Sequence, residues 1–305
     1  MRITIGTELL PPDPQWAWDP AKPLSGTTKF YVRVAEEFVK IGHDVFVEYA
    51  GPLRTLNGVR YGQDSGDLFL PDLFLDCNRQ RPAPEEEADD LSPARVQWTS
   101  FFNRPDTCVG EGYDRLFLVS DYVKSTLAPH LKAPATVLEL GTDASLLPEP
   151  NLAARGKVCC YTSSPDRGGK FLDAIWPDVE EATGYRLEKS PYGQDFSDED
   201  MRALYERSRF WVYPCIGTDS IVSCLEAQAA GCIPFYVPHM GLPETCRYGV
   251  TTDLFRFKAD LIRTLNEAEA RPQWFGIMDD QREDGFMFNP IPTWADVAKK
   301  ILSFV

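Results

Sequence analysis

Short apolar runs alternate along the chain with stretches whose apolar residues recur at helical spacing, and polar turns separate the two. The clearest example lies between positions 210 and 250. Two apolar runs, 210–213 and 233–237, each stop at a proline, and a polar turn between them leads into a helix-like stretch that Gly231 ends. This order predicts a strand, a loop, a helix and a second strand, which is the repeating unit of a parallel α/β sheet.

The first half of the chain shows the same alternation. Apolar positions at helical spacing predict an amphipathic helix over 28–41 and a shorter helix over 121–131. Strand-like runs precede and follow these helices at 2–6, 44–49, 68–75, 96–102, 115–120 and 136–140. The elements predict a sheet built from βαβ units with right-handed connections.

The second half begins after a polar, proline-containing link at 146–156. Its strand-like runs lie at 157–162, 185–188, 210–213 and 233–237. Its helices are expected around 171–176, 198–208, 260–270 and 294–304, and Ser197 with Asp200 makes a capping-box pattern before the second of them. We therefore expect two doubly wound, Rossmann-like α/β domains, 1–150 and 151–290, that face a cleft. The terminal helix, 291–305, is expected to pack back across them.

Composition and charge narrow the class of protein. No apolar run approaches the ~20 residues that span a bilayer, and the N-terminus is strand-like and lacks the features of a signal peptide. The net charge of −15 disfavours nonspecific binding to nucleic acid or anionic lipid. The eight cysteines include no CxxC pair, and the three histidines have no ligand spacing to a cysteine. We expect buried thiols in a reducing cytoplasm and no metal site.

The turn at 163–170, Ser-Ser-Pro-Asp-Arg-Gly-Gly-Lys, is the first candidate site. Its glycines, Gly168 among them, offer backbone N–H groups to an anion, and Arg167 and Lys170 add positive charge. The alternative is a glycine-rich turn whose two cations are simply solvated. A similar turn before the first-half helix contains Gly26, where a tight turn and a helix N-cap explain the pattern equally well.

The second candidate is Glu226, which stands on an otherwise apolar, small-residue helix face. A carboxylate in such surroundings needs polar partners. Hydroxyl groups of a sugar or ribose at the strand ends would serve, and the alternative is an ion-paired glutamate on a half-buried helix. His239 follows Pro238 on the same side of the predicted sheet, as a loop histidine.

The most specific stretches are Ser-Ser-Pro-Asp-Arg-Gly from 163 and Leu-Glu-Ala-Gln-Ala-Ala-Gly-Cys-Ile-Pro from 225. In this order and separation they resemble the retaining, nucleotide-sugar-dependent glycosyltransferases of the GT-B fold, in the large family-4-like group. The wider matching stretches are 161–177, 197–214, 223–237 and 241–249, with 25–49, 115–127 and 138–149 in the first half. The resemblance implies two Rossmann-like domains, with the acceptor in the N-terminal one and the nucleotide sugar in the C-terminal one.

The resemblance also assigns roles to single residues. Arg167 falls at the cationic position that contacts the donor diphosphate, and Lys170 is its helper. Ser163 or Ser164 stands where many members carry a second cation. Glu226 matches the carboxylate that holds the ribose of the nucleotide.

One position departs from the family pattern. Eight residues before Glu226 the family has a further glutamate that touches the donor sugar, and Thr218 stands there, with Asp219 beside it. Either one of these two residues takes over the contact or the donor preference has changed. Other positions are placed around the donor by the resemblance: Gly26 in the loop that approaches it, Tyr192 beside the base, and the backbone of Asp219, Ser220 and Ile221 beside the sugar and phosphates.

The implied activity is metal-independent and cofactor-free transfer of a sugar from a nucleotide diphosphate, UDP- or GDP-linked, to an acceptor hydroxyl. Arginine, lysine and helix N-termini would stabilise the negative charge that develops on the departing diphosphate. In retaining members that phosphate is thought to accept the proton of the acceptor, so no dedicated base is required. Asp76 and His239 are the residues to test for such a role.

The acceptor stays open at this point, with a glycan or lipid-linked glycan as the default. Hydroxymethylated bases of viral DNA are the alternative, and they would need a basic and aromatic face made of Arg79, Arg81, Arg95, Arg104, Trp98, Phe101 and Phe102. A core role for these aromatic residues is the favoured interpretation. Two other classes are a nucleotide-sugar epimerase and a non-catalytic, nucleotide-binding partner subunit, which the change at Thr218 suggests.

Overall fold

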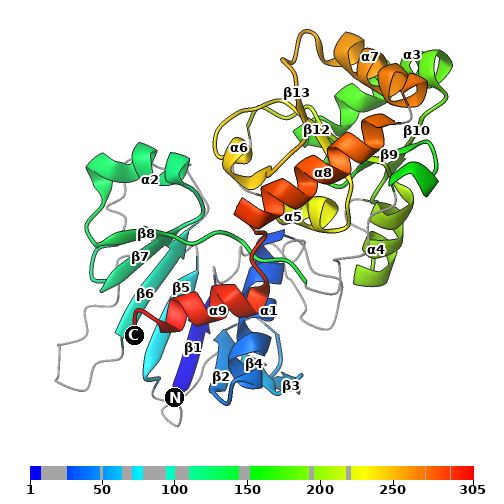
Figure 1. Cartoon of the computed structure of the whole chain (residues 1–305). Coiled ribbons are helices and arrows are strands. Elements are labelled where there is room, and N and C mark those ends of the chain that lie inside the picture. The colour runs from blue at the N-terminus through cyan, green and yellow to red at the C-terminus, as the bar shows by residue number, and fades with distance from the viewer. Residues whose placement is uncertain are drawn as a thin grey trace. The chain divides into compact units, whose positions relative to one another are not determined.

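The computed structural model describes residues 1–7, 26–48, 51–63, 71–77, 94–99, 110–143, 152–191, 196–217, 221–271, 273–288 and 290–305, with the backbone alone for 26, 27 and 283–288. The chain divides into two compact units (Figure 1). The first unit is Met1–Gly141 together with Pro292–Val305, and the second is Thr142–Ile291. Each unit holds one largely parallel sheet with helices, so the α/β class that the sequence predicts is confirmed.

The sheet of the first unit has the strand order β3-β4-β2-β1-β5-β6-β7-β8. Its strands are β1 (Arg2–Gly6), β2 (Asp44–Glu48), β3 (Arg54–Leu56), β4 (Val59–Gly62), β5 (Leu73–Cys77), β6 (Ala94–Thr99), β7 (Arg115–Leu118) and β8 (Ala135–Val137). Its helices are α1 (Gly26–Lys40), α2 (Asp121–Leu127) and α9 (Trp294–Leu302). The chain runs outward from β1 to β2 and β4 and then returns to β5 beside β1, so the strand order reverses between β1 and β5.

An antiparallel hairpin, β3 and β4, is the part of this sheet that the hydrophobic pattern does not predict. Its two-residue turn is Asn57-Gly58, with φ angles of 50° and 81°. Asn-Gly is the favoured pair for a type I′ hairpin turn, because both positions need positive φ. The signal therefore lies in the turn, since the strands are only three and four residues long.

Stacked aromatic rings form the centre of the first unit. Phe30 on α1 stacks on Trp98 of β6 with 4.0 Å between ring centroids, and Trp98 is fully buried. Trp294, the first residue of α9, meets Phe30 edge-on at 6.3 Å. Gly141 lies against Trp294, where a Cβ atom would come within 2.8 Å of the indole ring. The terminal helix thus completes the core of the first unit (Figure 1).

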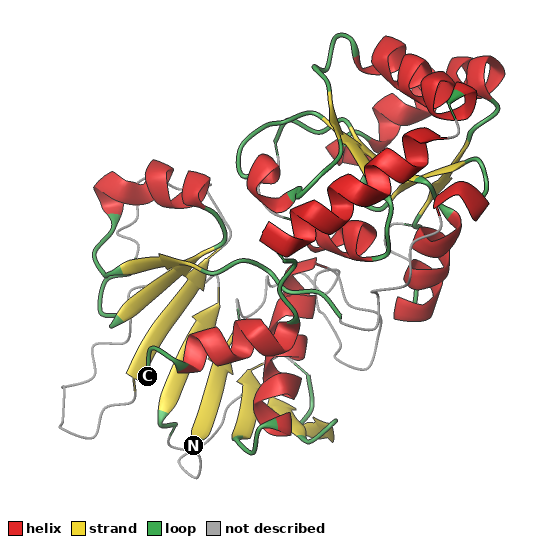
Figure 2. Cartoon of the chain, in the orientation of Figure 1, coloured by secondary structure: helices red, strands yellow, loops and turns green. Residues whose placement is uncertain are grey.

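The sheet of the second unit has five parallel strands in the order β10-β9-β11-β12-β13 (Figure 2). They are β9 (Val158–Tyr161), β10 (Arg186–Lys189), β11 (Phe210–Tyr213), β12 (Ile233–Tyr236) and β13 (Val250–Thr251). The helices are α3 (Gly169–Thr183), α4 (Asp198–Arg207), α5 (Val222–Ala229), α6 (Leu242–Thr245), α7 (Phe257–Ala270) and α8 (Gln273–Phe288). The predicted capping box of α4 is confirmed, with Ser197 and Asp200 bonding each other's backbone N–H groups.

The cysteines of the described residues are free thiols. Six of these seven are buried, as the sequence predicts, and Cys215 is half-buried. Burial raises the pKa of Cys159 and Cys224 well above the ordinary thiol value. These two thiols therefore stay protonated at neutral pH.

Arg155 joins the C-terminal ends of two helices in the second unit. Its guanidinium donates to the carbonyl oxygens of Tyr205 at 3.1 Å and Ser208 at 2.9 Å, at the end of α4. It also donates to the carbonyl oxygen of Ala230, at the end of α5. The last carbonyls of a helix lack i+4 partners, and Arg155 supplies donors to the ends of both α4 and α5, alongside the Cys232 thiol at α4.

Replacing Arg155 by Met should lower the free energy of unfolding of the second unit by about 1–3 kcal/mol, because the carbonyls at the ends of α4 and α5 lose the charged donor that joins them. Urea denaturation followed by circular dichroism measures the change. Arg186→Met, at an exposed position of β10, is the matched control and should stay within about 0.5 kcal/mol of the unchanged protein. Equal denaturation midpoints for the two variants would show that the clamp is unimportant.

Candidate functional site

The strand order of the second sheet reverses between β9 and β11. The chain leaves β9 for the outer strand β10 and then returns to β11 on the other side of β9. Two segments leave the sheet at this reversal, one that begins at 162 after β9 and one that begins at 214 after β11. In open parallel sheets ligands bind beside such a reversal, at the carboxyl ends of the strands. The structure thus places the predicted turn at the position where this architecture holds a ligand.

Gly168 fixes the conformation of the turn after β9. Residues Pro165–Arg167 form one turn of 3-10 helix, and Gly168 follows with a φ of 104° before α3 begins. A Cβ atom on Gly168 would lie 2.7 Å from Cγ of Pro214, the residue after β11. The turn therefore packs directly on the neighbouring loop, and only glycine fits both the space and the backbone angle.

Tyr161 anchors the same turn from the end of β9. Its hydroxyl donates to the carbonyl oxygen of Ser164 at 2.6 Å. Burial raises the pKa of Tyr161 to about 12, so the hydroxyl keeps its proton at neutral pH and remains a donor. Ser163 and Ser164 are both half-buried on this anchored segment.

The two cations of the turn differ in their surroundings. Lys170 pairs with Asp166 at 2.6 Å, one helical turn before it, and the two side chains are 76% and 79% exposed. The hydrogen bond that the Lys170 ammonium group donates to Asp166 raises the pKa of Lys170. Arg167 is exposed and makes no ion pair with a residue that the structure describes. Arg167 is therefore the cation of this turn whose charge is available to an anion, while that of Lys170 is shared with Asp166.

Glu226 lies on α5 and is only 5% exposed. The hydroxyl of Tyr205, on α4, lies 3.3 Å from Oε2 of Glu226 and 3.3 Å from Oγ1 of Thr162. Nε1 of Trp211, on β11, donates to Oγ1 of Thr162 at 2.9 Å. Four segments, the turn after β9, β11, α4 and α5, thus meet in one buried polar network.

The donors of this network can be assigned from their chemistry. An indole N–H only donates, so the hydroxyl of Thr162 accepts from Trp211 and can donate to Tyr205. Burial raises the pKa of Tyr205 well above its ordinary value, so its hydroxyl keeps a proton to donate. Oε2 of Glu226 and the carbonyl oxygen of Ser223, both 3.3 Å from the Tyr205 hydroxyl, are the acceptors within reach of that proton. The network holds Glu226 in place beside the turn that carries Arg167.

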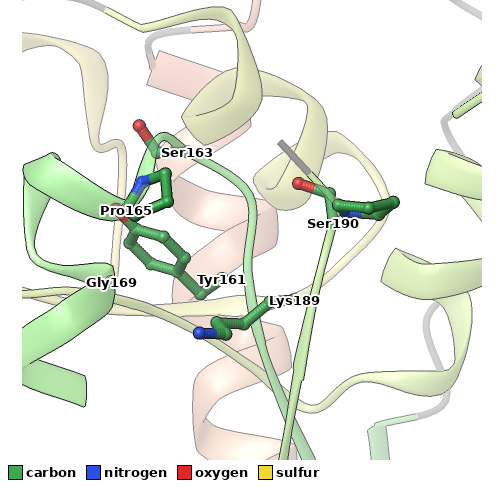
Figure 3. A pocket seen from close by; sticks show the side chains of 7 residues that line it. Tyr161, Ser163, Pro165, Gly169, Lys189 and Ser190 are labelled. Carbon is green, nitrogen blue, oxygen red and sulfur yellow. The ribbon is translucent and has the colours of Figure 1, made fainter. Parts of the chain in front are cut away.

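A cavity of about 250 Å³ opens on the other side of β9, toward β10 (Figure 3). Its lining residues are Tyr161, Ser163, Pro165, Gly169, Lys189, Ser190 and Pro191. Among the described residues that line it, Lys189, the last residue of β10, is the one that carries a charge. Its ammonium group donates to both carboxylate oxygens of Asp173 on α3, at 2.6 and 2.7 Å.

The remaining candidates, Asp76, Gly26 and His239, lie on other segments of the chain. Asp76 is the penultimate residue of β5 and pairs with Gly6 of β1, at the reversal of the first sheet. It is 2% exposed and accepts a hydrogen bond from the hydroxyl of Tyr113. Gly26 is the first residue of α1. His239 belongs to the second unit and is exposed in the loop after β12.

Ile221 is one of the predicted site residues that the structure describes. It is 8% exposed and precedes α5 without a side-chain cap. The predicted residues outside the description are Tyr192, Thr218, Asp219 and Ser220. Among the aromatic residues weighed for a DNA-binding face, Trp98 is a core residue, while Phe101 and Phe102 fall outside the description.

Sequence reasoning missed Thr162, Tyr205, Trp211 and Lys189. The one available signal was Thr162, a hydroxyl residue directly after an apolar strand.

Among the described residues no group of three His, Cys, Asp or Glu side chains is arranged to hold a metal ion. No helix within the described ranges is long and apolar enough to cross a bilayer.

No family model and no curated protein matches the chain in sequence. Solved structures match its fold over nearly its whole length. AviGT4, a glycosyltransferase involved in avilamycin A biosynthesis, matches with a TM-score of 0.64 at 15% identity, covering 99% of this chain and 96% of its own. Sucrose-phosphate synthase from Thermosynechococcus elongatus matches with a TM-score of 0.68 at 13% identity, covering 99% and 98%. The chain has the GT-B fold.

Anabaena HepE, solved in complex with UDP-glucose, matches this GT-B chain with a TM-score of 0.63 at 12% identity, covering 99% of this chain and 98% of its own. HepE has also been solved with UDP alone. The GT-B architecture of two Rossmann-like domains, which the sequence resemblance implies, is thus confirmed. At these identities the likeness concerns the fold, and the chemistry of the GT-B chain is argued from its own residues.

Three glycine substitutions separate backbone strain from steric conflict in this GT-B domain. Gly217 has no atom within 4 Å of an added Cβ, and Gly184 has such space but a φ of 72°. Gly217→Ala should leave the free energy of unfolding nearly unchanged, whereas Gly184→Ala should lower it by about 1 kcal/mol. Gly168→Ala adds the conflict with Pro214 and should lower it by about 2–3 kcal/mol. Thermal and urea denaturation of the three variants would refute this account of the turn if Gly168→Ala were no worse than Gly184→Ala.

Proposed function

We propose that the chain is a retaining glycosyltransferase that transfers a sugar from a nucleotide diphosphate donor to an acceptor hydroxyl. The observation that carries the proposal is that an exposed arginine, Arg167, and a buried carboxylate hydrogen-bonded by Tyr205, Glu226, both lie on segments that follow the strands at the reversal of the second sheet. The positive charge of Arg167 suits the diphosphate, and the carboxylate of Glu226 suits the ribose hydroxyls. The GT-B fold and the complexes of HepE with UDP and UDP-glucose support this reading.

Charge stabilisation is the chemical task of such a site. Breaking the sugar–phosphate bond leaves an additional negative charge on the departing diphosphate. Arg167 and the backbone N–H groups at the start of α3 and α5 would stabilise that charge, with Lys170 contributing when the anion competes with Asp166. The departing phosphate then accepts the proton of the attacking hydroxyl, so this scheme assigns neither a base nor a metal ion.

Glu226 would hold the nucleotide rather than take part in bond breaking. Ribose hydroxyls are donors and an ionised carboxylate is an acceptor, so the two are complementary. One oxygen of Glu226 already faces Tyr205, which fixes the direction of the carboxylate before a donor arrives. Preorganisation of this kind reduces the entropy lost on binding. The acceptor is proposed to be a hydroxyl of a glycan or lipid-linked glycan, held by the first unit.

A thermal-shift panel with UDP, GDP and their sugar conjugates tests the proposal directly. At least one nucleotide should raise the melting temperature, because a ligand that binds the folded state stabilises it. In Arg167→Ala the kcat/KM of donor hydrolysis or transfer should then fall roughly 30- to 1000-fold. This corresponds to a loss of about 2–4 kcal/mol of transition-state stabilisation. Arg186→Ala is the matched control and should retain the full rate. Nucleotide binding without hydrolysis or transfer of any donor would instead identify a non-catalytic partner subunit.

A double-mutant cycle tests the network behind Glu226. Glu226→Gln and Tyr205→Phe should each raise the Kd for UDP or GDP, whichever binds. Because Tyr205 acts through Glu226, the double variant should lose less than the sum, by a coupling energy of about 0.5–1.5 kcal/mol. Inorganic pyrophosphate lacks a ribose, so its Kd should not change in any variant. Additive losses, or equal losses for pyrophosphate, would mean that the two residues only stabilise the fold.

A further inference from the structure

We propose that Cys224 and Cys246, two buried thiols that touch each other in the second unit, are an oxidation site that a peroxide converts into a disulfide bond. The bond would latch α5 to the segment that follows α6. Such a latch changes the redox state and the stability of the second unit, whichever substrate the chain acts on.

The two sulfur atoms already face each other. Sγ of Cys224, in the first turn of α5, lies 3.2 Å from Sγ of Cys246, the residue after α6. A disulfide bond is about 2.05 Å long, so each sulfur atom has to move by only about 0.6 Å. Small rotations of the two side chains supply a movement of this size.

Gln228 holds the two segments at this distance. It lies one helical turn after Cys224 on α5 and is fully buried. Its side-chain amide donates to the carbonyl oxygen of Thr245 at 3.1 Å, and its Oε1 accepts from the backbone N–H of Arg247 at 2.7 Å. Thr245 and Arg247 flank Cys246 in the chain. One side chain of α5 therefore fixes the backbone on both sides of the second thiol.

Cys246 is the thiol that an oxidant can reach. It is 9% exposed, and the susceptibility of a thiol to oxidation follows its exposure. Hydrogen peroxide is only slightly larger than water, so a narrow opening admits it. The other buried thiols that the structure describes in this unit are 0% exposed: Cys159, Cys160, Cys224 and Cys232.

The oxidation balances as two successive displacements. The Cys246 thiolate attacks one oxygen of the peroxide, so that an S–O bond forms and the O–O bond breaks, and the released hydroxide takes up the thiol proton as water. The thiol of Cys224 then attacks the Cys246 sulfur and loses its proton. The S–S bond forms, the S–O bond breaks, and hydroxide leaves with that proton as a second water. The two thiols lose two electrons and the peroxide gains them.

The two thiols have different parts in this sequence. Burial raises the pKa of Cys224 well above the ordinary thiol value, while a hydrogen bond from Gln228 and the charge of Arg247 oppose the rise. Cys224 is therefore poorly suited to attack a free oxidant. Its attack on the oxidised Cys246 is intramolecular and starts from contact distance, where proximity replaces the encounter between two molecules.

The second unit has another thiol pair, which provides an internal comparison. Cys160 and Cys232 share a side-chain hydrogen bond, but both are 0% exposed. Sγ of Cys232 also donates to the carbonyl oxygen of Tyr205 at 3.2 Å. Without access for the oxidant, this pair is expected to remain reduced.

The latch should stabilise the folded second unit. The bond closes a ring from 224 to 246, which contains β12 and most of α5 with Glu226. A cross-link of this kind restricts the unfolded chain more than the folded one. In the oxidised protein α5 can no longer separate from the segment after α6.

Peptide mapping of the full chain tests the proposal. The reduced protein is treated with hydrogen peroxide, its remaining thiols are alkylated, and it is cleaved after glutamate without reduction. Cleavage after Glu226 and Glu244 places Cys224 and Cys246 on separate peptides, which mass spectrometry should find linked. The melting temperature should rise by roughly 5–10 °C and return to its starting value on addition of dithiothreitol.

Variants assign the link to the two cysteines. Cys224→Ala and Cys246→Ala should each lose both the linked peptides and the rise in melting temperature. Cys215→Ser is the matched control, because Cys215 is a half-buried thiol outside the pair, and it should keep both. The peptide map of the unchanged protein needs no variant, so the test remains decisive if an alanine variant fails to fold.

Three outcomes would overturn the inference. The first is a treated protein in which Cys224 and Cys246 both remain free while Cys215 is oxidised, which would show that the two thiols only pack against each other. The second is oxidation of Cys246 beyond the sulfenic acid without a link to Cys224. The third is a link that leaves the melting temperature unchanged or lowers it, which would mean that the bond strains the fold. None of these outcomes bears on nucleotide binding, so the proposed function stands or falls separately.

Discussion

The hydroxyl of one buried residue, Tyr205, holds the described part of the candidate site together. It lies 3.3 Å from the carboxylate of Glu226 and 3.3 Å from the hydroxyl of Thr162. These groups come from a helix, a second helix and the turn after β9, so none of the three can move without breaking a buried hydrogen bond. Leaving a buried polar group unpaired costs free energy. This cost keeps the Glu226 carboxylate and the turn that carries Arg167 in fixed positions within the second unit.

The order of elements was readable from the sequence because it depends on local patterns. The helix predicted over 28–41 is α1 at Gly26–Lys40, and the Ser197–Asp200 capping box is present as expected. The turn at 163–170 was readable for the same reason, since a strand, two glycines and a helix are adjacent in the chain. The strand order, which no local pattern contains, is what places this turn at the reversal where parallel α/β sheets generally bind ligands.

The misses have physical causes that differ from case to case. The run at 68–75 was predicted as a strand, but β5 is Leu73–Cys77 and includes Asp76. A polar residue can be buried in this strand because the hydroxyl of Tyr113 donates a hydrogen bond to the Asp76 carboxylate. Helix α8 was not predicted, because Gly276 and the acidic residues after Met278 interrupt its apolar spacing. Tyr205 and Lys189 look like ordinary helix and strand residues. Tyr205 joins the polar network and Lys189 lines the cavity only because segments far apart in the sequence pack together.

The second unit is an insertion within the first in terms of chain order. Met1–Gly141 precedes it and Pro292–Val305 follows it, and Trp294 then fills the space beside Phe30 and Gly141. During synthesis all residues of the second unit leave the ribosome before the last part of the first unit does. Domains generally fold as units as they emerge. The second unit can therefore finish folding first, while the first unit keeps an incomplete aromatic core until residues 292–305 have been made.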